Sequence, residues 1–325
     1  MTQSTLEVSH LYTSFFSERG EIKAVQDVSM RIGKGQVVGV VGESGCGKSM
    51  VARSIMGLIK KPGKIVSGSI LLDGQELTSL GENELCKIRG KDVSMVFQEP
   101  MTSLNPTMRV GLQVQEVVSI HENVSKEEAR QRTLAILSAV GIPEVKERYN
   151  AYPHELSGGL RQRVMIAMAM VMRPRLLIAD EPTTALDATV EAQIIALLRQ
   201  LADDGTSVLI ISHNLGVIAQ LADHVYVMYA GHVVESASVF ELFDNPLHPY
   251  TLGLLRAVSS LRSQSKVLQT IPGIVPNLAH LPVGCSFAPR CDKCMARCTS
   301  TQPELVAVGS GHEVRCHLTK RVDAQ

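Results

Sequence analysis

A glycine-rich segment that ends in a lysine and a hydroxyl residue is the strongest chemical signal in the chain. Gly42-Glu-Ser-Gly-Cys-Gly-Lys48-Ser49 follows the apolar run at residues 37–41 and matches G-x-x-x-x-G-K-[ST], the P-loop pattern. Its glycines let successive backbone N–H groups face phosphate oxygens, while the lysine reaches the β and γ oxygens and the hydroxyl binds Mg²⁺. The segment predicts a nucleoside triphosphate site lined by Gly42, Ser44, Gly45, Cys46, Gly47, Lys48, Ser49 and Met50.

Two adjacent carboxylates supply the acidic element that such a site needs. Asp180 and Glu181 end the apolar run at residues 176–179. We expect Asp180 to hold Mg²⁺ through water and Glu181 to polarise the attacking water, as in a Walker B motif. An apolar strand that ends in acidic residues is also an ordinary strand-to-loop boundary. The presence of the P-loop in the same chain favours the catalytic interpretation.

The elements that position these groups alternate between strand and helix. Apolar runs at residues 37–41, 176–179 and 208–211 read as buried strands, and apolar residues at helical spacing follow between 190 and 201. Ser125-Lys-Glu-Glu128 is a capping box, and it predicts a helix that ends near Gly141. This alternation predicts an α/β fold with a mostly parallel sheet covered by helices. We expect an ATPase domain over residues 1–258, with a helical subdomain at about 100–170, and an extension over 259–325.

Composition limits the possible partners and compartments. The 325 residues include 32 Lys and Arg and 32 Asp and Glu, so the zero net charge gives no reason to expect nucleic acid as a partner. The N-terminal residues lack the basic start and the apolar stretch of a secretion signal. No apolar run is long enough to span a bilayer. Five of the seven cysteines lie between residues 285 and 316. In a chain expected to stay in the cytosol, such a cluster indicates metal rather than disulfides.

A third motif stands between the two phosphate-site elements. Leu156-Ser-Gly-Gly-Leu160-Arg-Gln-Arg163 resembles the LSGGQ-like signature of the ABC ATPase family, with Leu160 where the commonest signature has glutamine. The resemblance implies that Ser157, Gly158 and Gly159 present a helix N-terminus to a γ-phosphate held by the P-loop of a partner subunit. A simple N-cap is the alternative interpretation.

Other family motifs follow in the same order. Gln98 matches the glutamine that senses Mg²⁺ and the attacking water, Ala185-Leu-Asp187 matches the D-loop, and His213 matches the switch histidine near the γ-phosphate. The resemblance implies Ser49 and Gln98 as Mg²⁺ ligands. It also implies an aromatic residue that stacks on adenine, for which Phe15 is the candidate. The rival candidates are Tyr12 and Phe16.

The extension resembles the C-terminal region of bacterial dipeptide and oligopeptide importer ATPases. Asn245-Pro-Leu-His-Pro-Tyr-Thr251 and Gly284-Cys-Ser-Phe-Ala-Pro-Arg-Cys291 carry this likeness. In this branch four cysteines are associated with an iron–sulfur cluster, and the matching positions are Cys285, Cys291, Cys298 and Cys316. The spacing suits [4Fe–4S] or Zn²⁺ equally, and a metal-free group of thiols stays open. Cys294 is either a spare ligand or a bystander.

The resemblance implies a subunit that hydrolyses ATP to energise a bacterial importer of di- or oligopeptides. Its expected partners are a paralogous ATPase in a head-to-tail heterodimer, two membrane permeases and, indirectly, an external solute-binding protein. The expected location is the cytoplasmic face of the inner or plasma membrane. Alternatives are an importer of nickel or another small solute, a soluble ABC ATPase without a transport role, and a redox or metal sensor centred on the cysteines.

Overall fold

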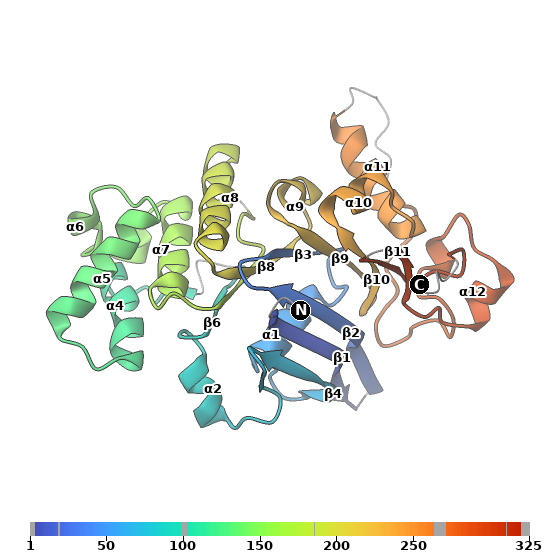
Figure 1. The fold of residues 1–325 in the computed structure, drawn as a ribbon, viewed down its shortest axis with the longest axis horizontal. Helices are drawn as coiled ribbons and strands as arrows, with labels where there is room; N and C mark the ends of the chain where they lie inside the picture. The colour runs from blue at the N-terminus through green and yellow to red at the C-terminus, as the bar shows by residue number, and fades with distance from the viewer. Residues whose placement is uncertain are drawn as a thin grey trace. The chain divides into compact units, whose positions relative to one another are not determined.

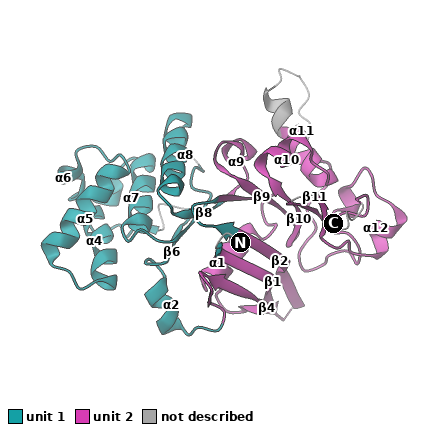
Figure 2. Cartoon of the chain, viewed as in Figure 1, with its two compact units in different colours: residues 1–5, 32–36, 79–210 teal, residues 6–31, 37–78, 211–325 magenta. Residues whose placement is uncertain are grey.

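The computed structural model describes residues 4–18, 20–98, 103–184, 186–262, 271–309 and 311–319, with the backbone alone at 258–262. The chain forms two compact units, both discontinuous in sequence (Figure 2). Unit 1 contains residues 1–5, 32–36 and 79–210, and unit 2 contains residues 6–31, 37–78 and 211–325. The C-terminal extension belongs to unit 2, and helix α11 (Pro249–Arg262) runs through the expected boundary at 258/259. That boundary stays a prediction.

Unit 2 contains a mixed sheet that ends in strands from the extension. Its strand order is β11-β12-β10-β9-β3. The strands are β3 (Val37–Val41), β9 (His224–Tyr229), β10 (His232–Ser238), β11 (Val306–Gly309) and β12 (His312–Val314). β3 and β9 are parallel, whereas β9, β10, β12 and β11 pair antiparallel in turn. The extension therefore continues the sheet of the nucleotide-binding unit, which the sequence did not predict.

A buried carboxylate explains why the extension adds to this sheet. Glu235 of β10 is fully buried and accepts hydrogen bonds from the backbone N–H groups of Leu247 and His248, at 2.7 and 3.1 Å. His312, at the start of β12, places its Nε2 2.9 Å from the same carboxylate. Because a buried carboxylate without partners is costly, this site favours the docked position of β12.

A second sheet is antiparallel and lies largely in unit 2. Its strand order is β2-β1-β4-β5. It comprises β1 (Ser4–Ser17), β2 (Gly20–Gly33), β4 (Gly63–Leu72) and β5 (Gln75–Glu76). β1 and β4 are antiparallel, as are β4 and β5. The α/β class is confirmed, but the expectation of a mostly parallel sheet is wrong for these strands. A two-residue turn returns the chain from β4 into β5, and β4 runs opposite to β1 although β2, β3 and α1 lie between them in the sequence.

The helices of unit 2 include one that begins at the end of the P-loop. They are α1 (Lys48–Ile55), α9 (Leu215–Leu221), α10 (Val239–Asp244), α11, the 3₁₀ turn η2 (Ala288–Arg290) and α12 (Ala296–Ser300). α1 begins directly after Gly47, which adopts a left-handed conformation with φ 106°. The P-loop thus leads straight into a helix N-terminus, whose dipole favours a bound anion.

Unit 1 combines strands in the order β8-β7-β6 with a group of helices (Figure 1). The strands are β6 (Val93–Val96), β7 (Leu176–Asp180) and β8 (Ser207–Ser212), most of which lies in this unit. The helices are α2 (Glu82–Ile88), α4 (Val110–His121), α5 (Lys126–Ala139), α6 (Val145–Arg148), η1 (Pro153–Glu155), α7 (Gly158–Met170) and α8 (Ala188–Asp203). β6 and β7 are parallel, so their carboxyl ends share one edge.

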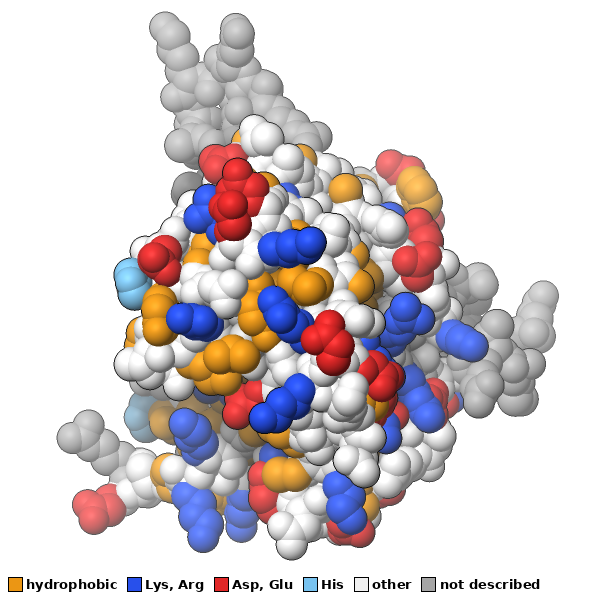
Figure 3. Space-filling view, turned by 90° about the vertical axis from the view of Figure 1, so that its left-hand side faces the viewer, with side chains coloured by type: hydrophobic (Ala, Val, Ile, Leu, Met, Phe, Trp, Pro, Cys, Tyr) orange, Lys and Arg blue, Asp and Glu red, His pale blue; other side chains and the backbone are white. Residues whose placement is uncertain are grey.

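Local signals in the sequence predicted several of these elements. The apolar runs form β3, β7 and β8, and the capping box opens α5, where the Ser125 hydroxyl accepts a hydrogen bond from the Glu128 N–H at 3.1 Å. Figure 3 shows the side of the molecule that carries α4 to α6, with acidic and basic side chains interspersed among apolar ones. No charge of one sign dominates that face.

One buried histidine, His248, and two half-buried histidines, His224 and His232, make unit 2 sensitive to acid. His224 Nε2 lies 2.8 Å from the Ser236 hydroxyl, and His248 Nδ1 accepts the Tyr250 N–H at 3.1 Å. Burial lowers the pKa of His224 and His232 to about 4 and that of His248 to about 3. The imidazoles are therefore neutral in the folded chain at pH 5, where they are protonated in the unfolded chain.

We predict that acid destabilises the folded chain before its carboxylates titrate. Because the folded pKa values lie below the unfolded value of about 6.5, the free energy of unfolding is largest above pH 6.5 and falls toward pH 4. Each histidine contributes a slope of up to about 1.4 kcal/mol per pH unit. Urea unfolding at pH 7.5, 6 and 5 should show a shallower decline for His248→Gln, while the exposed control His154→Gln keeps the wild-type slope. Equal slopes for both variants would contradict this assignment.

Candidate active site

The P-loop is held in shape by close backbone approaches. Gly42 has φ 154°, and a Cβ there would lie 2.2 Å from the carbonyl oxygen of Met228. A Cβ on Gly47 would lie 2.4 Å from the carbonyl oxygen of Ala24. Only glycine fits at these positions, because any side chain would displace backbone atoms of β2 or β9. The loop that precedes α1 is thus fixed from both ends.

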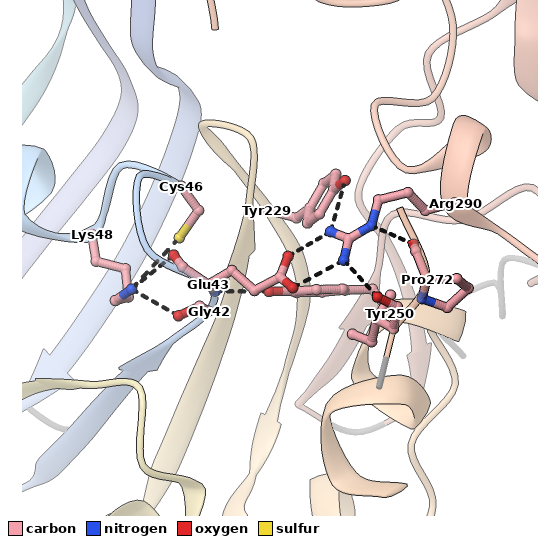
Figure 4. Close-up of polar contacts among 9 residues, drawn as sticks. Gly42, Glu43, Cys46, Lys48, Tyr229, Tyr250, Pro272 and Arg290 are labelled. Atoms are coloured by element: carbon pink, nitrogen blue, oxygen red, sulfur yellow. Dashed lines mark hydrogen bonds and ion pairs between the residues drawn. The ribbon is translucent and has the colours of Figure 1, made fainter. Parts of the chain in front are cut away.

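Lys48 lies inside this loop rather than in solvent. Its ammonium donates hydrogen bonds to the carbonyl oxygens of Gly42 and Glu43, at 2.7 and 3.0 Å (Figure 4). The side chain is buried, whereas Ser49 and Met50 are half-buried and Ser44 and Gly45 are exposed. Phosphate oxygens can replace these carbonyls as acceptors, because an ammonium binds an anion more strongly than a neutral oxygen.

Cys46 lies in the interior of the loop. Its side chain is fully buried, its Sγ is 3.9 Å from Lys48 Nζ, and its carbonyl accepts the Gly231 N–H at 2.9 Å. Burial raises the pKa of this thiol, and the nearby lysine opposes that shift. Since the thiolate is the reactive form, a buried thiol with a raised pKa is inert.

In unit 1 the structure brings Gln98 and Glu181 together. Gln98 follows β6 and Glu181 follows β7, and Gln98 Nε2 donates to Glu181 Oε2 at 2.8 Å. The Thr184 hydroxyl donates to the same oxygen at 3.0 Å, a contact that the sequence did not predict. Glu181 has φ 49°, an uncommon conformation for a residue other than glycine, and such conformations cluster at functional sites. Asp180 is buried at the end of β7.

The signature motif opens α7. Ser157 is the N-cap, and its hydroxyl accepts a hydrogen bond from the Leu160 N–H at 3.4 Å. Ser157 and Gly158 are exposed, so the positive end of the α7 dipole faces solvent. The N-cap interpretation and the anion-binding interpretation are therefore compatible.

The D-loop aspartate lies next to this helix end through Val190 of α8. Asp187 is the N-cap of α8 and accepts a hydrogen bond from the Val190 N–H at 2.9 Å. A Cβ on Gly159 would lie 2.9 Å from a Val190 methyl carbon, so the two helix starts pack closely. Ser157, Gly159 and Val190 line one pocket of about 560 Å³. Ala185 lies outside the described residues.

The remaining nucleotide candidates lie in unit 2. His213 is exposed directly after β8. Phe15 is half-buried, with its ring against Gly63, whereas Tyr12 and Phe16 are exposed. The Phe16 ring lies 4.8 Å below Lys64 Nζ. Unit 2 thus carries the P-loop, the aromatic candidates and His213, and unit 1 carries Gln98, Asp180, Glu181, Ser157 and Asp187.

The four predicted cysteines converge in the extension. Cys285, Cys291, Cys298 and Cys316 all line one cavity of about 10 Å³, roughly the space of one water molecule. The Cys285 N–H donates to the Cys298 carbonyl at 2.8 Å, which joins two of the cysteine segments. Burial and the neighbouring thiols raise the pKa values of Cys285 and Cys316. Cys294 is exposed and does not line the cavity.

Within the described ranges, no three or more His, Cys, Asp or Glu side chains are placed so as to hold a metal ion, so the convergent thiols face a common space without forming a coordination sphere. No helix in the part of the chain that the structure describes has the length and hydropathy needed to cross a bilayer.

The burial of Cys46 gives a testable difference in reactivity. We predict that Cys86, which is exposed, reacts with Ellman's reagent within minutes at pH 8, whereas Cys46 does not react in the folded chain. Peptide mapping after labelling identifies the modified positions, and labelling in urea confirms that Cys46 is chemically competent. Modification of Cys46 in the native chain at a rate similar to that of Cys86 would contradict the buried position.

Comparison with known proteins agrees with this geometry. One family model, described as ABC transporter, matches residues 25–184, and another, described as the C-terminal region of oligopeptide/dipeptide transporters, matches residues 234–298. The chain is 51% identical to the oligopeptide transport ATP-binding protein AppD of Bacillus subtilis, over 98% of both chains. It is 49% identical to OppD of Escherichia coli, over 92% of this chain and 88% of the relative.

A solved structure shows the same architecture. The dimeric structure of MJ0796, titled a bacterial ABC transporter cassette, matches with a TM-score of 0.66 and 29% identity, over 72% of this chain and 98% of the other. With relatives near 50% identity over almost the whole sequence, the P-loop, the Gln98–Glu181 pair and the signature helix have one consistent explanation. The chain belongs to the oligopeptide and dipeptide importer family of ABC transporter ATP-binding subunits.

Proposed function

We propose that this ABC ATPase hydrolyses ATP to energise the uptake of di- and oligopeptides. The observation that carries the catalytic part is the contact of Gln98 and Thr184 with the Glu181 carboxylate, which holds a general base at the end of β7. The names of AppD and OppD, oligopeptide transport ATP-binding proteins, support the peptide substrate. Nickel or another small solute is the alternative cargo.

The proposed roles follow from the positions of the side chains. Lys48 would exchange its loop carbonyls for β and γ oxygens of ATP, and the Ser49 hydroxyl and Asp180 would hold Mg²⁺. Bound Mg²⁺ neutralises charge on the phosphates. Glu181 would accept a proton from the attacking water, and Gln98, which orients that carboxylate, would also be a ligand of the metal. His213 contacts the γ-phosphate, and Phe15 stacks on adenine.

We further infer a head-to-tail pair of ATPase subunits. The exposed N-terminus of α7, with Ser157, Gly158 and Gly159, suits the γ-phosphate of a nucleotide bound to the P-loop of the other subunit, and Asp187 lies next to it. The likeness to a dimeric cassette supports this arrangement. We propose that the second subunit is a paralogous ATPase and that the pair docks on two permeases at the cytoplasmic membrane face. A solute-binding protein outside supplies the substrate.

The Glu181→Gln variant tests the proposed reaction. Removing the general base should lower ATP turnover by roughly two orders of magnitude or more while ATP binding persists, because the amide cannot accept the proton. Peptide uptake by cells or proteoliposomes that carry the assembled transporter should be lost with it. The control Glu147→Gln, at an exposed position of α6, should retain both activities. Unchanged peptide uptake in Glu181→Gln would overturn the assignment.

Two other outcomes separate the alternatives. Uptake of nickel but not of peptides would favour the small-solute importer. ATP hydrolysis that requires neither permease, in a chain that does not co-purify with membrane subunits, would favour an ABC ATPase without a transport role.

We also propose that Cys285, Cys291, Cys298 and Cys316 hold a [4Fe–4S] cluster that stabilises the extension. Four thiols from three separate segments line one cavity, and four thiolates are the donor set of such clusters. Tetrahedral Zn²⁺ is the alternative with the same donors. Because the cavity now has room for about one water molecule, binding requires the cysteine side chains to rotate outward.

Metal analysis of the full chain purified without oxygen tests this proposal. We expect roughly four iron and four acid-labile sulfide per chain. Cys285→Ser and Cys298→Ser should abolish both, while the matched variant Cys294→Ser, whose thiol lies outside the cavity, should retain them. Zinc alone at one per chain would support the tetrahedral site instead. Neither metal in the wild-type chain would refute both, and dependence of ATP turnover on redox potential would favour the sensor interpretation.

A further inference from the structure

A residue at a variable position of the P-loop pattern is held by the C-terminal extension. Glu43 lies between Gly42 and the exposed Ser44. Its carboxylate forms a two-pronged ion pair with Arg290, with Nη1 at 2.6 Å from Oε2 and Nη2 at 3.0 Å from Oε1 (Figure 4). The arginine side chain is only 4% exposed and that of Glu43 is 28% exposed. Such a planar, paired contact fixes orientation as well as distance.

Arg290 is itself held in place by groups other than Glu43. Its Nε donates to the Pro272 carbonyl at 2.9 Å, and its Nη2 donates to the Ile271 carbonyl at 3.2 Å. Nη1 also lies 3.4 Å from the Tyr229 hydroxyl, and the guanidinium carbon is 5.8 Å from the centre of that ring. The guanidinium is therefore oriented by contacts other than those with Glu43. It can thus fix the position of the Glu43 carboxylate.

The backbone of Glu43 is fixed as well. Its N–H donates to the Tyr250 hydroxyl at 2.8 Å, and its carbonyl accepts from Lys48 Nζ. Tyr250 is fully buried and packs against Tyr229 and Phe287, with ring centres 4.7 and 5.4 Å apart. The N–H of Glu43 is thus engaged by Tyr250 of α11, its side chain by Arg290 of η2 and its carbonyl by Lys48.

The ion pair between Glu43 and Arg290 also changes the charge balance of the P-loop. A carboxylate in a phosphate-binding loop repels the triphosphate, and the repulsion is strong where the surroundings exclude water. Arg290 neutralises this charge and draws the carboxylate toward the extension. Loss of the arginine would leave an unbalanced negative charge in the phosphate-binding loop and release the loop at the same time.

We propose that Arg290 is a positioning residue of the ATP site, which acts through Glu43 to hold the P-loop in its phosphate-binding shape and to neutralise its carboxylate. Arg290 does not contact the nucleotide. The extension is thus a component of the nucleotide site, independently of any metal that its cysteines bind and of the solute that the transporter carries.

Affinity for MgATP, measured on the full chain by displacement of a fluorescent nucleotide, tests the proposal. Arg290→Gln should weaken binding roughly tenfold, because both loop support and charge balance are lost. Glu43→Gln should weaken it less, since that change also removes the repelling charge. The double variant Arg290→Gln with Glu43→Gln should bind like Glu43→Gln alone, and Arg290→Lys should be intermediate because lysine lacks the paired donors.

Two control variants separate this role from a general loss of stability. Arg315 is another buried arginine of the extension, but it binds Asp27 and the Val233 carbonyl rather than the P-loop, so Arg315→Gln should lower the urea midpoint without weakening MgATP binding. The exposed Arg297→Gln should change neither. Unchanged affinity in Arg290→Gln, or equal losses in Arg290→Gln and Arg315→Gln, would overturn the proposal. Peptide uptake is not measured, so the outcome does not depend on the transported solute.

Discussion

The backbone curvature of the P-loop is the constraint on which the nucleotide-binding unit depends. Gly42 and Gly47 each bring the loop so close to a neighbouring carbonyl, of Met228 and of Ala24, that no side chain fits. These approaches fold Lys48 back onto the carbonyls of Gly42 and Glu43 and close Cys46 off from solvent. The positions of Lys48 and Cys46 within the loop therefore depend on two close approaches of main-chain atoms.

The position of the Glu181 carboxylate depends on a different constraint. Glu181 lies at the point where β7 ends, in a left-handed conformation that costs free energy for a residue with a side chain. Gln98 and Thr184 both donate to its carboxylate, and these bonds compensate for part of that cost. Because parallel β6 and β7 end at the same sheet edge, Gln98 is brought next to Glu181 although 83 residues separate them.

The sequence was most informative where a local pattern carries both structure and chemistry. The strand before Gly42 and the acidic pair at the end of β7 are each contained in one short segment, so spacing alone predicted them. The antiparallel sheet and strands β11 and β12 were missed, because their pairing depends on distant partners. His312 docks on a buried glutamate 77 residues away, and nothing near Glu235 indicates that its carboxylate is buried. Arg290 was missed for the same reason, since no local motif links it to Glu43.

The pairing of Glu43 with Arg290 also has a consequence for the order in which the protein is made. The two residues are 247 positions apart, and the arginine lies in the last eighth of the chain. Synthesis proceeds from the N-terminus, and early segments fold as they emerge from the ribosome. The P-loop and Lys48 are thus synthesised well before Arg290. Only a chain translated beyond residue 290 can complete the ATP site, so truncated products retain an intact phosphate-binding motif but lack the arginine that balances its charge.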